Sequence, residues 1–236
     1  MKNNPRPLQK MFNEVPQRYD LMNRILTFRM DEMWRRKTVT ECLKNYPSKV
    51  LDLCTGTGDL ALRLAKKADG SIEVIGVDFS EPMMEVARKK ALKKSINNIR
   101  FVFGDVANLP FPSNHFDSIG IGFAFRNLTY KNPNTRKYLS EILRVLKKNG
   151  RFVIVETSQP ENMLMRKLYH FYMKNFVATI GGFLSGHPAA YHYLAHSARN
   201  YYNPLEVETL LKEAGFAKTE HLSLMTGMAA IYIAKK

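Results

Sequence analysis

The residues best suited to chemistry follow the apolar run at 49–53, in the turn Asp52-Leu-Cys-Thr-Gly56-Thr57-Gly58-Asp59. Glycines in such a turn let the backbone bend sharply and let a ligand approach it closely. The turn has neither the G-x-G-x-x-G of a dinucleotide fingerprint nor the Gly-Lys-Ser/Thr of a P-loop. It therefore favours a ligand without phosphate groups.

Two further acids end the next two apolar runs. Asp78 closes the run at 73–78, where a carboxylate can accept both hydroxyls of a ribose. Asp105 follows the run at 99–103, where it can meet the amino group of an adenine. One such Asp is usually a helix cap. Three acids at successive strand ends favour a nucleoside with a positive centre, a description that S-adenosylmethionine fits.

The elements that must position these residues alternate regularly. Short β-branched runs followed by helical patterns predict a parallel sheet covered on both faces. The last helix is followed by two runs joined around Thr226-Gly227, a spacing typical of an antiparallel hairpin. The expected strands are 49–53, 73–78, 99–103, 116–122, 150–156, 217–224 and 228–234, and the expected helices are 59–67, 82–94, 134–146 and 204–214.

Two segments stand outside this alternation. Residues 1–48 indicate a helical N-terminal cap rich in Arg and aromatic residues, and residues 157–203 an apolar lid insertion. Both are expected to cover the carboxyl ends of the strands, where open parallel sheets bind ligands. Residues 1–236 are therefore expected to form a single α/β domain.

Several motifs give the chain a family resemblance. From Lys49 to Lys236 it resembles the class I methyltransferases, whose Rossmann-like seven-stranded sheet is mostly parallel and ends in an antiparallel hairpin. Nearly end to end, it resembles the C-methyltransferases of menaquinone and ubiquinone biosynthesis. The motifs that carry this resemblance are Phe12-Asn-Glu-Val-Pro-Gln-Arg-Tyr19-Asp20-Leu-Met-Asn23, Met33-Trp34-Arg35-Arg36, Asn108-Leu-Pro-Phe-Pro112, Gly122-Phe-Ala-Phe-Arg126-Asn127, Arg144-Val-Leu-Lys-Lys-Asn-Gly150 and Tyr191-His-Tyr193-Leu194.

The resemblance implies an S-adenosylmethionine site. It assigns Thr57, Asp78, Asp105, Val106 and Gly122 to that site, alongside Asp52, Gly56 and Gly58 of the first turn. Some relatives carry Ser in place of Gly122 and Asn-Ala in place of residues 105–106. Ala124 replaces a family Gly, which narrows the expected quinol slot.

The resemblance also implies a reaction, methyl transfer to a ring carbon of a prenylated hydroquinone. Carbon is a poor nucleophile until the neighbouring hydroxyl loses its proton. Arg126 can stabilise that phenolate or hold a water that takes the proton, and Asn127 can orient the same oxygen. Tyr19 shares a helix face with Asn23 and can present its phenol to the pocket, although a packing role fits it equally well. The sequence does not distinguish a naphthoquinol from a benzoquinol.

The formal net charge of +15 suits an anionic surface. A prenylated substrate lies in a bilayer, so we expect a cytoplasmic protein that docks peripherally on the inner face of the membrane. A solvated basic face and an ordinary core helix explain the same residues, and a homodimer remains open. The candidate docking residues are Arg24, Arg29, Arg35, Arg36 and Lys37, with Met163, Leu164, Tyr169, Phe171, Tyr172 and Phe176 as the path for the isoprenoid tail.

Other signals are weaker. Cys42 and Cys54 form no C-x-x-C motif, which favours a reduced compartment, and no base is in register with Cys54. His187, His192 and His196 lack an accompanying acid or thiol, so no metal is expected. The apolar stretch at 176–184 has about half of the roughly 20 residues that a membrane span needs.

Two rival functions remain. The positive charge and the shared turn also fit a methyltransferase acting on RNA or on another small molecule. Enzymes that methylate exocyclic base nitrogens typically carry Asn/Asp-Pro-Pro-Tyr/Phe after the fourth strand, where this chain has Gly-Phe-Ala-Phe-Arg-Asn. No RNA-binding module is visible, so no nucleic-acid partner is expected. A binding protein without catalytic activity would show damage at Asp78 or Arg126, and both residues are present.

Overall fold

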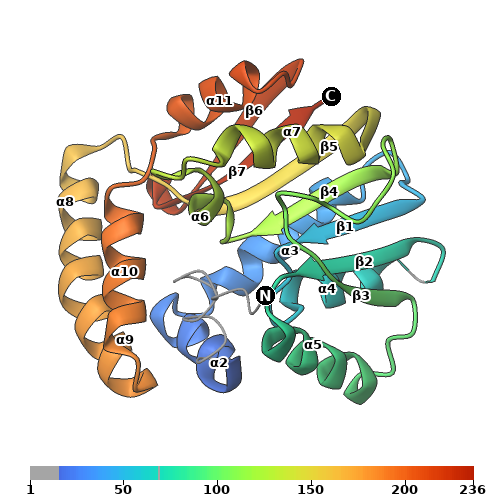
Figure 1. Ribbon diagram of the computed structural model, residues 1–236. Coiled ribbons are helices and arrows are strands. Elements are labelled where there is room, and N and C mark those ends of the chain that lie inside the picture. The colour runs from blue at the N-terminus through green and yellow to red at the C-terminus, as the bar shows by residue number, and fades with distance from the viewer. Residues whose placement is uncertain (1–15, 69) are drawn as a thin grey trace, which may run out of the picture.

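A seven-stranded sheet forms the centre of the computed structural model, which describes residues 16–68 and 70–236 (Figure 1). The strand order is β3-β2-β1-β4-β5-β7-β6. The first five strands pair in parallel, and β7 runs antiparallel between β5 and β6. The predicted fold class is thereby confirmed. The strands are β1 (Lys49–Leu53), β2 (Glu73–Asp78), β3 (Ile99–Phe103), β4 (Phe116–Gly122), β5 (Leu146–Thr157), β6 (Lys218–Leu224) and β7 (Ala229–Lys235).

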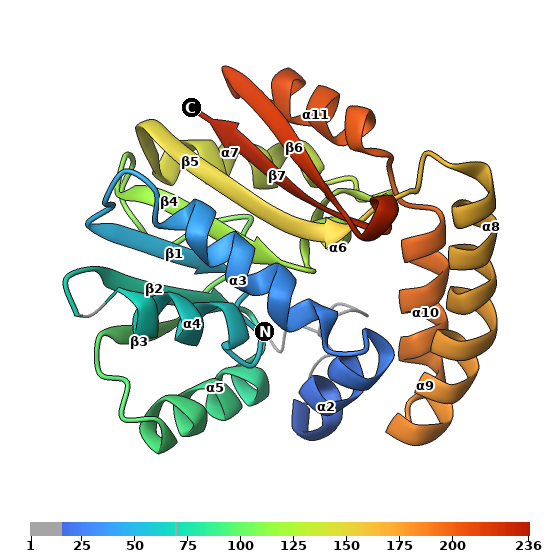
Figure 2. The same cartoon turned by 180° about the vertical axis from the view of Figure 1, so that it is seen from behind.

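Helices cover both faces of this sheet, as the two opposite views show (Figures 1 and 2). Because successive side chains of a strand point to opposite faces, neighbouring residues belong to different apolar clusters. Val50 packs in the cluster of α3 and α4, whereas Leu51 packs in the cluster of α6, α7 and α11. The helices are α3 (Met30–Cys42), α4 (Asp59–Lys67), α5 (Glu81–Lys93), α6 (Phe125–Thr129), α7 (Thr135–Val145) and α11 (Pro204–Glu213).

The first helix of the cap and the helices of the lid stand beyond the carboxyl ends of the parallel strands (Figure 1). The second helix of the cap packs instead against a face of the sheet (Figure 2). The cap consists of α2 (Pro16–Leu26) and α3. The lid consists of α8 (Met163–Tyr172), the π-helix η1 (Met173–Val177), α9 (Ala178–Ser185) and α10 (Pro188–Arg199). Within the described residues, no helix is both long enough and apolar enough to cross a bilayer.

Cap and lid share one apolar cluster. Met22 and Leu26 of α2 are buried together with Tyr191 of α10 and with side chains of α8 and η1. Gly181 of the lid makes this packing close, because a Cβ at that position would lie 3.2 Å from Cδ1 of Leu26 in the cap and 2.6 Å from Cδ1 of Tyr191. The two covers of the sheet edge are therefore packed against each other.

The predicted start of the fifth strand was wrong. The helix expected at 134–146 ends at Val145, and the strand expected at 150–156 already begins at Leu146. Leu146 pairs with Phe116, and a register shift after Phe116 accommodates the residues up to Arg151. The short helix α6 was not predicted, because five residues are too few to show a helical period.

Gly58 offers a test of how closely the turn after β1 packs against α5. It has φ +80°, and a Cβ there would lie 2.8 Å from Cβ of Ala87 in α5. Gly70 has φ +78° but open space around it, so Gly70→Ala is a matched control for backbone strain alone. We expect Gly58→Ala to lower the free energy of unfolding by about 1–3 kcal/mol more than Gly70→Ala, measured by urea denaturation. Equal losses would contradict the close contact between Gly58 and Ala87 of α5.

Candidate functional site

The three strand-end acids converge around one residue, Cys54. It lies in the turn after β1 with φ +55°. Burial, and then the charges of Asp78, Asp52 and Asp105, hold the pKa of the Cys54 thiol well above its ordinary value. Its thiol therefore stays protonated, which argues against a nucleophilic role. The same electrostatics show that the carboxyl ends of β1, β2 and β3 bring their acids into one region.

Asp52 supports the turn from inside. Its side chain is 1% exposed, and its Oδ2 accepts hydrogen bonds from Oγ1 of Thr55 at 2.7 Å and from the backbone N of Ala61 at 2.9 Å. Burial raises the pKa of Asp52 to about 7. These contacts make Asp52 a residue that fixes the shape of the turn, rather than one that faces a ligand directly.

Asp78 ties the turn after β1 to the turn after β2. Its Oδ2 accepts a hydrogen bond from the backbone N of Gly56 at 2.8 Å, and its Oδ1 accepts one from the backbone N of Ser80 at 2.9 Å. Burial raises its pKa, although backbone donors partly oppose that shift. A carboxylate held in this way keeps further lone pairs that can accept hydroxyl hydrogens.

The same edge has room for a ligand. Gly56 has φ +53° and no protein atom within 4 Å of the position that a Cβ would take. A Cβ on Gly122, at the end of β4, would lie 3.7 Å from the nearest protein atom, in Leu60, so protein packing does not require glycine there. Asp105 accepts a hydrogen bond from the backbone N of Ala107 at 2.9 Å, and Val106 is buried in the core. The strand order thus lines up Asp105, Asp78, the β1 turn and Gly122 along one edge, which suits an elongated nucleoside.

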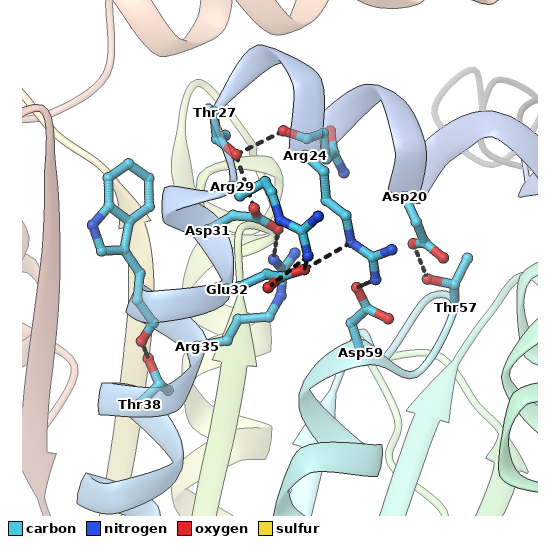
Figure 3. Close-up of polar contacts among 12 residues, drawn as sticks. Asp20, Arg24, Thr27, Arg29, Asp31, Glu32, Arg35, Thr38, Thr57 and Asp59 are labelled. Carbon is cyan, nitrogen blue, oxygen red and sulfur yellow. Dashed lines mark hydrogen bonds and ion pairs between the residues drawn. The ribbon is translucent and has the colours of Figure 1, made fainter. Parts of the chain in front are cut away.

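Helix α2 contacts this turn directly (Figure 3). Thr57 donates its hydroxyl hydrogen to Oδ1 of Asp20 at 2.6 Å. Asp20 also forms an ion pair with Lys90 of α5, and Lys90 lies 2.8 Å from Oδ1 of Asp59 at the start of α4. Arg24 lies 3.7 Å from the other oxygen of Asp59. The cap is therefore joined to both sides of the turn.

Arg126 forms a buried ion pair at the other side of the site. Its Nη1 donates to Oε1 of Glu156 at 2.8 Å and to Oγ1 of Thr157 at 2.9 Å. Its Nε donates to Oγ of Ser197, on lid helix α10, at 3.0 Å. Arg126 is 2% exposed and Glu156 is fully buried. The sequence suggested a cation available to a phenolate, but Glu156 already balances the charge of this guanidinium.

Asn127 lies next to this ion pair and faces the lid. The hydroxyl of Tyr193 donates to Oδ1 of Asn127 at 3.3 Å, and Tyr193 is still 37% exposed. Burial raises the pKa of Tyr193, Arg126 lowers it and Glu156 raises it, so the phenol senses the buried pair. Tyr19 falls within α2, but its side chain lies outside the described part of the chain.

Sequence reasoning missed three residues of this arrangement, namely Asp20, Glu156 and Ser197. Glu156 lies near the carboxyl end of β5, so the rule that found Asp78 and Asp105 could also have found it. Asp20 and Ser197 have no comparable signal, because each meets its partner only through folding. Among the described residues, no group of three or more His, Cys, Asp or Glu side chains is arranged to hold a metal ion.

Comparisons with known proteins identify the family of this chain. The ubiE/COQ5 methyltransferase family matches residues 1–236. A demethylmenaquinone methyltransferase of Thermus thermophilus is 40% identical over 94% of this chain and 98% of its own. A ubiquinone/menaquinone biosynthesis C-methyltransferase of Geobacter sulfurreducens is 38% identical over 97% of this chain and 88% of its own.

Solved structures agree with the fold. A SAM-dependent methyltransferase of Thermotoga maritima, titled a possible histamine N-methyltransferase, superposes with a TM-score of 0.65. It is 21% identical to this chain, and the match covers 97% of this chain and 99% of that one. A SAM-dependent methyltransferase of Aquifex aeolicus superposes with a TM-score of 0.61 at 22% identity, over 99% of each chain. At these identities the two structures show a shared fold.

The buried Asp52 predicts a pH effect on stability. Its folded pKa of about 7 exceeds the ordinary value of 3.8, so the folded state holds this proton more tightly than the unfolded chain does. Its contribution to stability therefore falls as pH rises from about 4 to about 7, by at most about 1.4 kcal/mol per pH unit. Asp52→Asn should remove this component. The free energy of unfolding of the variant, measured by urea denaturation, should therefore increase relative to that of the wild type as pH rises across that range.

Asp117 provides a control of opposite sign. Hydrogen bonds from Lys147, Ser48 and the backbone of Lys49 outweigh partial burial and lower its pKa to about 2. Its stabilising contribution is present above pH 4 or so and is lost as pH falls towards about 2. Asp117→Asn should therefore lose stability relative to the wild type as pH rises through this interval.

The result for Asp52 has a contradicting outcome. If the free energies of unfolding of Asp52→Asn and the wild type differed by a constant amount from about pH 4 to about pH 8, Asp52 would not be buried in this way.

Proposed function

The chain belongs to the ubiE/COQ5 methyltransferase family and is an S-adenosylmethionine-dependent methyltransferase, and we propose that its acceptor is a ring carbon of a prenylated hydroquinone. The reaction belongs to menaquinone or ubiquinone biosynthesis. The observation that carries the choice of acceptor is the Arg126–Glu156 pair, which lies beside Asn127 and beneath the lid. It supports a polar place for a ring hydroxyl beside the lid.

The donor site follows from the strand order. Asp105 suits the adenine, Asp78 suits the ribose hydroxyls, and the Gly56-Thr57-Gly58 turn with Gly122 suits the remaining part of the molecule. When bound, S-adenosylmethionine supplies an electrophilic methyl group on a positively charged sulfur. Asp52 acts indirectly, by holding the turn in shape.

The acceptor must be activated next to that edge. At pH 7 a phenol with a pKa of about 10 ionises at a cost of about 4 kcal/mol, because each pKa unit corresponds to about 1.4 kcal/mol. Donors that are already oriented in a dry site can supply stabilisation of that size. Arg126 offers oriented N–H donors rather than an unpaired charge, and Asn127 offers an amide beside it. As the ring carbon takes the methyl group, it gives up its hydrogen as a proton, which restores the aromatic ring.

A direct assay tests this function. Purified protein is mixed with labelled S-adenosylmethionine and a short-chain demethylmenaquinol, a short-chain benzoquinol precursor, or total RNA. We expect label in a quinol and none in RNA. Arg126→Lys keeps the positive charge but loses the planar fork of donors, so its turnover should fall at least about 100-fold. Its affinity for S-adenosylhomocysteine should remain within about threefold of the wild type.

Two outcomes would count against the proposal. Labelled RNA with unlabelled quinols would identify the rival acceptor class. Full turnover in Arg126→Lys would remove Arg126 from the reaction. Because Arg126 is buried beside Glu156, its variant is first compared with the wild type by thermal unfolding. Tyr19 stays a proposed acceptor-side residue, and Tyr19→Phe joins the same assay.

We also propose that the lid and cap dock on an anionic lipid surface, where a prenylated substrate resides. Large apolar side chains lie exposed along the lid, with Phe183 84% and Phe171 60% exposed, and along α2 and its end, with Phe28 73% exposed. Exposed Lys167 and Lys174 accompany them on the lid. We call this surface the apolar rim; it comprises Leu21, Ile25, Phe28, Met163, Leu164, Leu168, Phe171, Phe176, Ile180 and Phe183.

The structure changes the choice of docking residues made from the sequence. Arg35 is buried and paired with Asp31, and Arg24 is paired with Glu32 and Asp59. Tyr169 is only 5% exposed, so it belongs to the core rather than to the path of the tail. Tyr172 is partly buried and donates its hydroxyl hydrogen to the backbone O of Leu26 at 2.7 Å.

Vesicle sedimentation tests this docking. The wild type should bind vesicles that contain anionic phospholipid, bind neutral vesicles less, and be released by salt. The double variant Phe171→Ser/Phe183→Ser should lose most of the binding, because it removes two large apolar side chains from the proposed docking surface. The fold should tolerate both changes, since Phe171 is 60% and Phe183 84% exposed. Tyr46→Ser is the control, since Tyr46 is 97% exposed just before β1, at the opposite end of the sheet.

Binding that is unchanged in the double variant would exclude the apolar rim as the docking surface. Light scattering is measured on the same samples. A halving of particle mass in the double variant, without any vesicle binding by the wild type, would show that the rim joins two copies of this chain instead.

A further inference from the structure

Asp20 joins the cap to the turn after β1, and the proposed function gives this residue no role. It lies on α2, and its Oδ1 accepts the hydroxyl hydrogen of Thr57 at 2.6 Å. Thr57 is 3% exposed and stands between the two glycines of the turn (Figure 3). A carboxylate can only accept hydrogen bonds, so the hydrogen of Thr57 points towards Asp20. The remaining lone pairs of the Thr57 oxygen are then left as acceptors.

The position of Asp20 is fixed from two sides. Lys90 forms an ion pair with Asp20 and lies 2.8 Å from Oδ1 of Asp59. Two acids thus share one lysine at this junction, and Arg24 approaches Asp59 at a longer distance of 3.7 Å. The side chain of Asp20 is only 17% exposed. These contacts hold the carboxylate in one place against the turn.

The strand order indicates which part of the donor reaches this point. Adenine is assigned to the acid after β3 and ribose to the acid after β2, and these are the first and second strands from one side of the sheet. The turn after β1 is the next position along the edge, so the amino-acid part of the molecule continues over Thr57. That part carries an ammonium group, which only donates hydrogen bonds and therefore requires acceptors.

We propose that Asp20 is a positioning residue for the donor. By taking the hydrogen of Thr57, it presents the Thr57 oxygen as an acceptor to the ammonium of S-adenosylmethionine and of its demethylated product. The cap thereby takes part in recognising the amino-acid portion of the cofactor as well as covering the site. The inference rests on the S-adenosylmethionine-dependent activity given above.

The test compares two nucleosides that differ in this portion. S-adenosylhomocysteine has the amino-acid portion, and 5′-methylthioadenosine lacks it. Calorimetry on the ligand-free full-length chain should show that Asp20→Ala and Thr57→Val each bind S-adenosylhomocysteine about tenfold more weakly than the wild type. The affinity for 5′-methylthioadenosine should stay within about threefold in both variants. The double variant should be no weaker than Thr57→Val alone, because Asp20 acts through Thr57.

Glu32→Gln is the matched control. Glu32 is another acid of the cap, and it pairs with Arg24 and Arg29 rather than with the turn. Its substitution should leave both affinities unchanged.

The outcomes separate the two proposals. If the wild type bound neither nucleoside, the donor itself would be wrong and the role of Asp20 would fall with it. If the wild type bound both but Asp20→Ala weakened them equally, Asp20 would only hold the cap in place. If Asp20→Ala changed neither affinity, Thr57 would not depend on Asp20. Either of the last two results would overturn the inference while leaving the methyltransferase activity intact.

Discussion

A buried arginine–glutamate pair is the constraint on which the acceptor side of this structure depends. Removing two charges from water is costly, and their attraction repays this only if the remaining donors and acceptors are also satisfied. Here groups from different elements supply several of these partners. Glu156 accepts from the side chain and backbone of Arg126 in α6, and Arg126 donates to Ser197 in α10. The pair thus requires the ends of β4 and β5 and the lid to meet at one place.

The donor side depends on carboxylates in a comparable way. Asp52 and Asp78 each lie largely out of water and accept hydrogen bonds from the turn after β1, so the turn has a fixed shape before a ligand arrives. Burial raises the pKa of both acids, a cost to the folded chain at neutral pH. Rigid, partly strained turns of this kind are typical of binding sites, where preorganisation is gained at the expense of stability.

The sequence was sufficient for the sheet and for placing the strand-end acids along one edge of it. β-Branched runs and strand-end acids are local patterns, so β1, β2, β3 and β4 agree with the predicted bounds, and Asp78 reaches the predicted edge. It was not sufficient for contacts that depend on the third dimension. Nothing near Asp20 in the sequence indicates Thr57, and nothing near Arg35 indicates that it lies above the ring of Phe123. Glu156 stands near the end of a strand, as the other acids do, but the sequence does not indicate that it pairs with Arg126.

The apolar cluster shared by α2 and α10 has a kinetic consequence. Met22 and Leu26 are buried against lid residues that include Tyr191, so displacing either cover alone would expose apolar surface of both to water. Cap and lid therefore open together more readily than one at a time. A molecule held beneath either cover would therefore be released in the same opening event.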